Sequence, residues 1–197
     1  MRIDNLISKI KIRLNNYTID DRIILSIVDD QRSLQIKNYV NKNAILNNSF
    51  QILKVPIIKY GPNMMISERE IPNTIRNNFN DGVLAVSFDD LELSEIQYLP
   101  EHSNLSNYGI SQSTSSLTYA KSHNGKLIIK NTVNPTLLLC EYIYVKGYFS
   151  HPISVIKYNN PNMYNSELYL CDYPINDELY AYIEPEIIKA LNESGFR

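Results

Sequence analysis

The chain has 197 residues, a formal net charge of −2, and hydrophobic residues at 44% of its positions. A chain of this length buries roughly 70% of its unfolded surface, so it can fold without disulfides or metal ions. The near-neutral balance excludes an overall basic field that would hold nucleic acid. No apolar run approaches the ~18 residues of a membrane-spanning helix. The first ten residues intersperse charges with aliphatics, which argues against a signal peptide. We therefore expect the product to stay inside the cell that makes it.

The N-terminal region is predicted to be helical. Over residues 3–14 the aliphatic side chains recur at helical spacing, and the remaining positions make the segment basic. Thr18–Asp21 resembles a capping box that opens a second helix, which should fade near residues 41–43. We predict a helical hairpin over residues 1–46. Because the second helix lacks a basic face, packing is favoured over a DNA-binding helix-turn-helix.

Residues 47–197 are predicted to be a β-rich region with a C-terminal helix, forming one compact unit with the first region. Pro56 interrupts two short extended runs, which favours an edge position or a bend. Residues 83–88 and 91–99 are expected strands. The long polar connections over residues 61–82 and 101–116 are expected to be extended loops that become ordered in an assembly.

The clearest hairpin spans residues 117–130, with Asn124-Gly125 at its turn. Next, residues 136–152 are apolar or aromatic at both odd and even positions, which indicates a central strand covered on both sides. We therefore predict a meander of three consecutive strands from residue 117 to residue 149.

The last element is predicted to be a helix from about residue 178 to residue 193, capped by Asn176 or Asp177. Pro185 should break or kink it unless the helix starts nearby. This end of the chain is acidic, opposite in sign to the N-terminal helix. Together these elements predict an α+β fold, with an N-terminal helical hairpin, a central, mostly antiparallel β-sheet or sandwich, and a C-terminal helix.

Residue types that carry catalysis are not clustered in the sequence. The three histidines are scattered, without another His or a Cys at metal-ligand spacing. The two cysteines are interpreted as reduced core thiols, and the paired acids as helix starts or solvated surface pairs. We therefore predict no enzyme activity and no catalytic, cofactor or metal site. The residues concerned are His102, His123, His151, Cys140, Cys171, Asp20-Asp21, Asp29-Asp30 and Asp89-Asp90.

The chain contains fifteen tyrosines, which suit base-stacking platforms, carbohydrate sites, protein cores and protein–protein interfaces. No cluster of Arg or Lys accompanies them, so core and interface are favoured.

Three segments of the chain resemble a known family. They are IVDDQRS at residues 27–33, IKNTVNPTLLLCEYIYVKGYFSHP at residues 129–152, and CDYPINDELYAYI at residues 171–183. In order and spacing they are similar to the head-to-tail connector proteins, also called ring or adaptor proteins, of crAss-like bacteriophages. The most specific part is Asp172-Tyr173-Pro174-Ile175, followed by Leu179 and Tyr182-Ile183.

The resemblance implies a virion structural protein at the head–tail junction, assembled in the host cytoplasm. It would form a ring, usually of twelve copies, between portal and tail. Genomic DNA would pass through the lumen during ejection without specific binding. The expected partners are other copies of the chain, the portal protein and neighbouring connector or tail proteins, with no membrane and no cofactor.

A ring requires contact between two different faces of the same chain. The predicted interface residues lie in the basic helix, a polar loop and the acidic helix; they are Arg2, Lys9, Lys11, Arg13, Tyr108, Asp177, Glu178, Tyr182 and Glu186.

Two other functions remain open. One is a tail-associated receptor- or glycan-binding β-sandwich whose tyrosines line a sugar site, which binding on a glycan array would support. The other is a small intracellular regulator that places its N-terminal helices on DNA. Gel-shift binding with a steep salt dependence would support that function.

Overall fold

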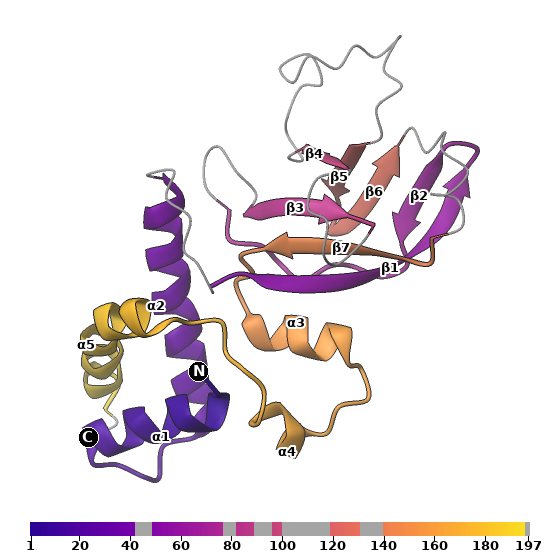
Figure 1. Cartoon of the computed structure of the whole chain (residues 1–197). Helices are drawn as coiled ribbons and strands as arrows, with labels where there is room; N and C mark the ends of the chain where they lie inside the picture. The colour runs from indigo at the N-terminus through magenta and orange to yellow at the C-terminus, as the bar shows by residue number, and fades with distance from the viewer. Residues whose placement is uncertain (42–48, 77–81, 89–95, 100–118, 131–139, 196–197) are drawn as a thin grey trace. The chain divides into compact units, whose positions relative to one another are not determined.

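The computed structural model describes residues 1–41, 49–76, 82–88, 96–99, 119–130 and 140–195 (Figure 1). The chain divides into two compact units. The helical unit comprises Met1–Gln51 and Phe149–Arg197, and the sheet unit comprises Ile52–Tyr148. Helices at both ends of the sequence and a mostly antiparallel sheet between them confirm the predicted α+β class. Within the ranges described, no helix is both long and apolar enough to cross a bilayer.

In the part of the chain that the structure describes, the helical unit contains five helices. They are α1 (Ile3–Leu14), α2 (Asp21–Asn41), α3 (Pro152–Asn159), α4 (Asn165–Leu168) and α5 (Asp177–Glu193). Helix α1 buries one apolar stripe, and α5 does the same with side chains three and four positions apart. The buried residues are Ile3, Leu6, Ile7 and Ile10 in α1, and Leu179, Tyr180, Ile183, Ile187 and Leu191 in α5.

Backbone hydrogen bonds join the two ends of the chain in this unit. The Ile3 amide donates to the Cys171 carbonyl at 3.0 Å, and the Tyr173 amide donates to the Met1 carbonyl at 2.7 Å. The Asp4 amide also donates, to the carbonyl of Tyr169. The first amides of a helix have no partner within it. The segment before α5 therefore satisfies the start of α1, where no side chain provides a cap.

Helix α5 runs through Pro185 instead of breaking there. The side chain of Asn176 caps it, accepting a hydrogen bond from the Leu179 amide at 2.7 Å. A proline inside a helix costs about 3 kcal/mol. Each buried aliphatic side chain on either side contributes about 1.5–3 kcal/mol. The summed burial outweighs the proline, so the predicted break is wrong.

The described residues of the sheet unit form seven strands. They are β1 (Gln51–Gly61), β2 (Met64–Ser67), β3 (Val83–Ser87), β4 (Gln97–Leu99), β5 (Tyr119–His123), β6 (Lys126–Lys130) and β7 (Tyr142–Gly147), in the order β3-β7-β1-β2-β6-β5-β4. Strand β4 is parallel to β5, whereas β5–β6, β2–β6, β1–β2 and β3–β7 are antiparallel. A bridge between Val86 and Ile96 joins the two ends of this order, so the sheet curls back on itself.

The β5–β6 hairpin is confirmed, and the meander is wrong. Asn124 and Gly125 have φ of 49° and 75°, as the tight turn of a two-residue hairpin requires. Strand β7, however, lies between β3 and β1 and not beside β6. Residues 61–82, expected as a loop, include β2, which pairs with both β1 and β6. The start of the expected central strand and the loop at 101–116 lie outside the described residues.

Pro56 lies inside β1, which is an interior strand and continuous. Pairing with β2 starts only at Ile57, and the Pro56 carbonyl accepts a hydrogen bond from the Glu68 amide at 2.9 Å. The missing N–H of proline therefore falls at the end of the β1–β2 ladder, where it costs little. The predicted edge position is wrong for this reason.

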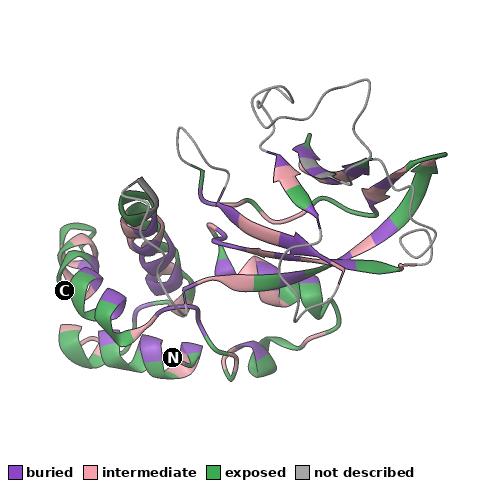
Figure 2. Cartoon of the chain, turned by 45° about the horizontal axis from the view of Figure 1, so that its top comes forward, coloured by how far each residue is buried: buried purple, intermediate pink, exposed green. Residues whose placement is uncertain are grey.

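Strand β7 has a neighbour on either side, but only one of its faces is buried. Ile143 and Val145 are fully buried, whereas Tyr142 on the other face is 41% exposed. The expectation of a strand covered on both sides is therefore wrong. Strand β1 follows the same rule, because Leu53, Val55 and Ile57 are buried and residues between them face outward (Figure 2).

Candidate protein-interaction surfaces

A buried polar cluster in the helical unit ties together three segments that are distant in the sequence. Arg32, on α2, is fully buried. Its guanidinium donates through Nε to the Pro174 carbonyl and through Nη1 to the Phe149 carbonyl, both at 2.9 Å. Through Nη2 it donates to the Ser49 carbonyl at 2.6 Å. A single side chain thus holds the segment before β1, the segment after β7 and the segment before α5.

Asp29 lies one turn before Arg32 and is also buried. Its carboxylate accepts a hydrogen bond from the Tyr173 hydroxyl, and its Oδ2 lies 3.1 Å from Nδ1 of His151. Burial raises the pKa of the Asp29 carboxyl, although the hydrogen bonds from Tyr173 and His151 oppose this effect. Burial and the nearby Asp29 raise the pKa of Tyr173 well above its ordinary value, so the phenol remains a donor.

Asp29, Arg32, His151 and Tyr173 form what we call the Arg32 cluster. Its members come from the three segments that carry the family resemblance. The interpretation of Asp29-Asp30 as a solvated surface pair is wrong for Asp29, whereas Asp30 is exposed. Sequence reasoning missed the cluster, although a signal was present. Asp29 and Arg32 are three residues apart on α2, beside the apolar residues Val28 and Ile36, which are buried. Charged residues at such positions in a helix indicate a buried polar contact.

Across the described ranges, no three His, Cys, Asp or Glu side chains gather in a way that could hold a metal ion. The members of the Arg32 cluster bond to one another and to backbone carbonyls, which makes the cluster a structural joint. Cys140 and Cys171 form no disulfide and are only partly buried, so the expectation of core cysteines is wrong.

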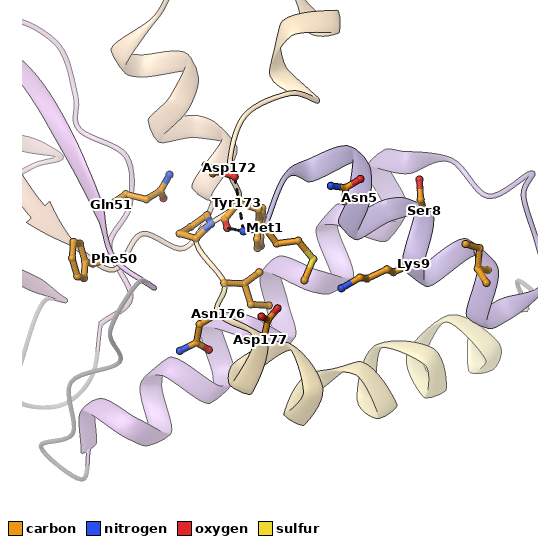
Figure 3. Close-up of a pocket in the computed structure, with 13 residues that line it drawn as sticks. Met1, Asn5, Ser8, Lys9, Phe50, Gln51, Asp172, Tyr173, Asn176 and Asp177 are labelled. Atoms are coloured by element: carbon orange, nitrogen blue, oxygen red, sulfur yellow. Dashed lines mark hydrogen bonds and ion pairs between the residues drawn. The ribbon is translucent and has the colours of Figure 1, made fainter.

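An open groove of about 870 Å³ lies in the helical unit beside α1 (Figure 3). One wall is formed by residues of α1, among them Ser8 and Lys9, and the other by residues 172–177. The α-amino group of Met1 lies 4.0 Å from the Asp172 carboxylate within it. The lining combines acidic, basic and apolar side chains, so it does not indicate one class of ligand.

The predicted basic residues of α1, and Arg2 just before it, have partners within the chain. Lys11 pairs with Asp21 at 2.6 Å, and Arg13 pairs with Glu184 of α5 at 3.3 Å. Lys9 lies 5.3 Å from the centre of the Tyr180 ring, and Arg2 pairs with Asp4 at 2.5 Å. Burial, followed by a hydrogen bond to Glu184, raises the pKa of Tyr180. The basic face of α1 thus serves in part to hold α5.

The predicted residues of α5 are exposed. Glu178, Tyr182 and Glu186 follow one another at four-residue spacing, so they share one side of the helix. The side chain of Tyr182 is 60% exposed. We call these three residues the acidic stripe. Asp177 adjoins it and is exposed too, whereas Tyr108 lies outside the described residues.

A second exposed surface, in the sheet unit, was missed by sequence reasoning. On the outer face of β1 and β7 lie Lys54, Ile58, Tyr60 and Tyr142, which we call the lysine–tyrosine face. Tyr60 is 63% exposed and Ile58 48% exposed. Lys54 Nζ lies 4.2 Å from the centre of the Tyr142 ring, which places the two strands' side chains on the same face. Because Pro56 was interpreted as an interruption, the alternation of apolar and outward-facing residues along β1 was not recognised.

A family model described as phage tail ring protein 2 (CrAss_Ring_2) matches residues 2–194, nearly the whole chain. No curated protein matches the sequence.

Proposed function

The chain belongs to the phage tail ring protein 2 family, and on that premise we propose that it is a non-enzymatic subunit of the head-to-tail connector. The family assignment confirms the resemblance to ring proteins of crAss-like phages and makes the chain a structural protein of the phage tail. In our proposal, about twelve copies close into a ring between portal and tail. Assembly takes place in the host cytoplasm.

The observation that carries the proposal is the acidic stripe of α5. A large aromatic side chain stands in solvent between two carboxylates, Glu178 and Glu186. Exposed aromatic residues surrounded by polar groups are typical of protein interfaces. A ring subunit must offer each neighbour a different face, and a stripe of one charge sign suits one half of such a contact.

The charge of the chain agrees with a lumen through which DNA passes. With a formal net charge of −2, the protein has no overall basic field to retain the phosphate backbone. In the proposed ring, DNA moves past the subunits without specific binding. The portal protein and the neighbouring connector or tail proteins are the other partners.

The mass of the purified protein, alone and mixed with portal protein, tests the proposal. We expect a closed oligomer near twelve copies, formed by the chain itself or on the portal. A monomer under both conditions would contradict the ring. A phage that lacks the gene supplies an independent test, because its particles should package DNA and then leak it or fail to join tails. Intact and infectious particles would count against the connector role.

A further inference from the structure

We propose that the ring contact is formed by the acidic stripe of one copy and the lysine–tyrosine face of the next copy. This inference rests on the proposed ring and names the two surfaces that build it. It assigns a second copy of this chain as the partner of both surfaces.

The charges of the two surfaces are complementary. On this face, strands β1 and β7, described along their full lengths, carry Lys54 and Lys146 and no acidic residue. The first ten residues of α5 carry exposed Asp177, Glu178 and Glu186. Lys189, which is also exposed, lies beyond Glu186, so the negative charge is concentrated in those ten residues. Opposite potentials across an interface select the partner and its register.

The order of the groups along the stripe is also suitable. Glu178 and Glu186 are eight residues apart on a helix, which corresponds to about 12 Å along its axis, and Tyr182 lies halfway between them. With the two acids facing lysines of the next copy, Tyr182 meets the apolar side chains of the face.

The apolar part of the contact accounts for the exposed aromatic groups. Tyr182 on the stripe, and Ile58, Tyr60 and Tyr142 on the face, each leave about two fifths or more of their surface in solvent. Aromatic side chains at the centre of an interface carry much of its binding energy, and charged residues form its rim. The two surfaces have this composition when they are put together.

The contact is head-to-tail by construction. The stripe belongs to the helical unit and the face to the sheet unit, so the two surfaces are different patches of one chain. When each copy uses its stripe toward one neighbour and its face toward the other, the contact is heterologous. Such a contact closes into a ring when the rotation between copies allows it.

Charge reversal on each surface tests the proposal in the full chain. The stripe variant is Glu178→Lys with Glu186→Lys, and the face variant is Lys54→Glu with Lys146→Glu. Each variant alone should lose the ring mass, measured by native mass spectrometry under the conditions in which the unmodified chain assembles. An equimolar mixture should restore it, because each reversed surface then meets its complement on the other variant.

Two controls make the result specific. Glu68→Lys with Glu70→Lys makes the same charge change at exposed positions outside both surfaces, and should assemble normally. Circular dichroism of every variant should match the unmodified chain, because all the changed side chains are exposed or half-buried. Rescue by mixing also separates the proposed contact from pairing of the two surfaces within one chain, which mixing cannot restore.

The possible failures are distinguishable. If the unmodified chain stays monomeric alone and on portal, the proposed function and this contact fall together. If the ring forms and both variants still assemble, the ring stands and this contact is wrong. If the face variant assembles but loses binding to DNA in a gel shift, the lysine–tyrosine face is a nucleic-acid surface and the proposal is overturned.

Discussion

The two units of the molecule bury different kinds of side chain. In the sheet unit, the buried polar residues that the structure describes are serines, namely Ser67, Ser87 and Ser122. In the helical unit, a charged pair, Asp29 and Arg32, lies in the core. Burying charge is costly unless every group is hydrogen-bonded. The helical unit therefore depends on directional bonds that the sheet unit does not need.

The difference follows from how each unit is connected. The sheet unit is one continuous segment, and its strands find their register through ladder hydrogen bonds and alternating burial. The helical unit is assembled from the two ends of the sequence. Apolar side chains attract any apolar surface, whereas three carbonyls around one guanidinium accept a single arrangement. The Arg32 cluster thus specifies which segments meet.

The largest effect on stability is expected from Arg32→Met, which removes the guanidinium of the Arg32 cluster from the helical unit. The substitution leaves three buried carbonyls without their donor, and we expect it to lower the free energy of unfolding of the helical unit by about 3–5 kcal/mol. Urea denaturation followed by far-ultraviolet circular dichroism measures the loss. Arg22→Met is the matched control, because Arg22 is exposed and binds only Asp20 among the partners observed. Equal midpoints for the two variants would show that the Arg32 cluster is dispensable.

In the sheet unit the corresponding weak point is a close backbone approach. Gly82 has φ of +71°, and a Cβ there would lie 2.5 Å from the Ile75 carbonyl oxygen. Gly82→Ala should destabilise this unit by about 2–4 kcal/mol, through backbone strain together with the clash. Gly195→Ala separates the two effects, because Gly195 has φ of +84° with nothing within 4 Å of the added Cβ. If both variants lose the same stability in thermal melts, the clash contributes nothing.

A smaller effect is expected at the start of α5. Asn176→Ala removes the acceptor of the Leu179 amide and should cost about 1 kcal/mol. Asn176→Asp keeps an acceptor at the same place and should remain near the unmodified stability in urea titrations. An aspartate variant as weak as the alanine variant would show that the side chain acts by some means other than capping.

The dependence of stability on pH sharpens the contrast between buried and exposed acids. The pKa of Asp29 is raised above 3.8, mainly by burial, so the native state binds its proton more tightly than the unfolded state. Relative to Asp29→Asn, the unmodified chain should therefore lose stability as pH rises through the range above 3.8. Denaturation midpoints measured from pH 3 to pH 7 give this difference.

Asp20 supplies the opposite case. Its hydrogen bonds with exposed Arg22 lower the pKa of its carboxyl to about 2. Relative to Asp20→Asn, the unmodified chain should keep its advantage above pH 3.8 and lose it as pH falls toward 2. Slopes of the same sign for the two aspartates would contradict the burial of Asp29.

The exposure of the candidate interface residues on α5 could be predicted from the helical periodicity of the sequence. The contacts that α5 makes with other elements could not. Glu178, Tyr182 and Glu186 are exposed because the spacing of the apolar residues of α5 leaves them on its other side. The pairing of Arg13 with Glu184 requires knowing that α1 and α5 are neighbours. Charge patterning along one helix cannot show whether a basic residue faces solvent or an acid 171 positions away.

Elements whose signals lie within a turn or two of the chain could be predicted from the amino-acid sequence. The apolar stripe of α1, the Asn124-Gly125 hairpin and the Asn176 cap all depend on neighbours in sequence. Only the tertiary structure decided the partners of β7, the tolerance of Pro56 within β1 and the burial of Asp29. A periodic pattern records that a face is covered, and the identity of what covers it is set by long-range packing and hydrogen bonding.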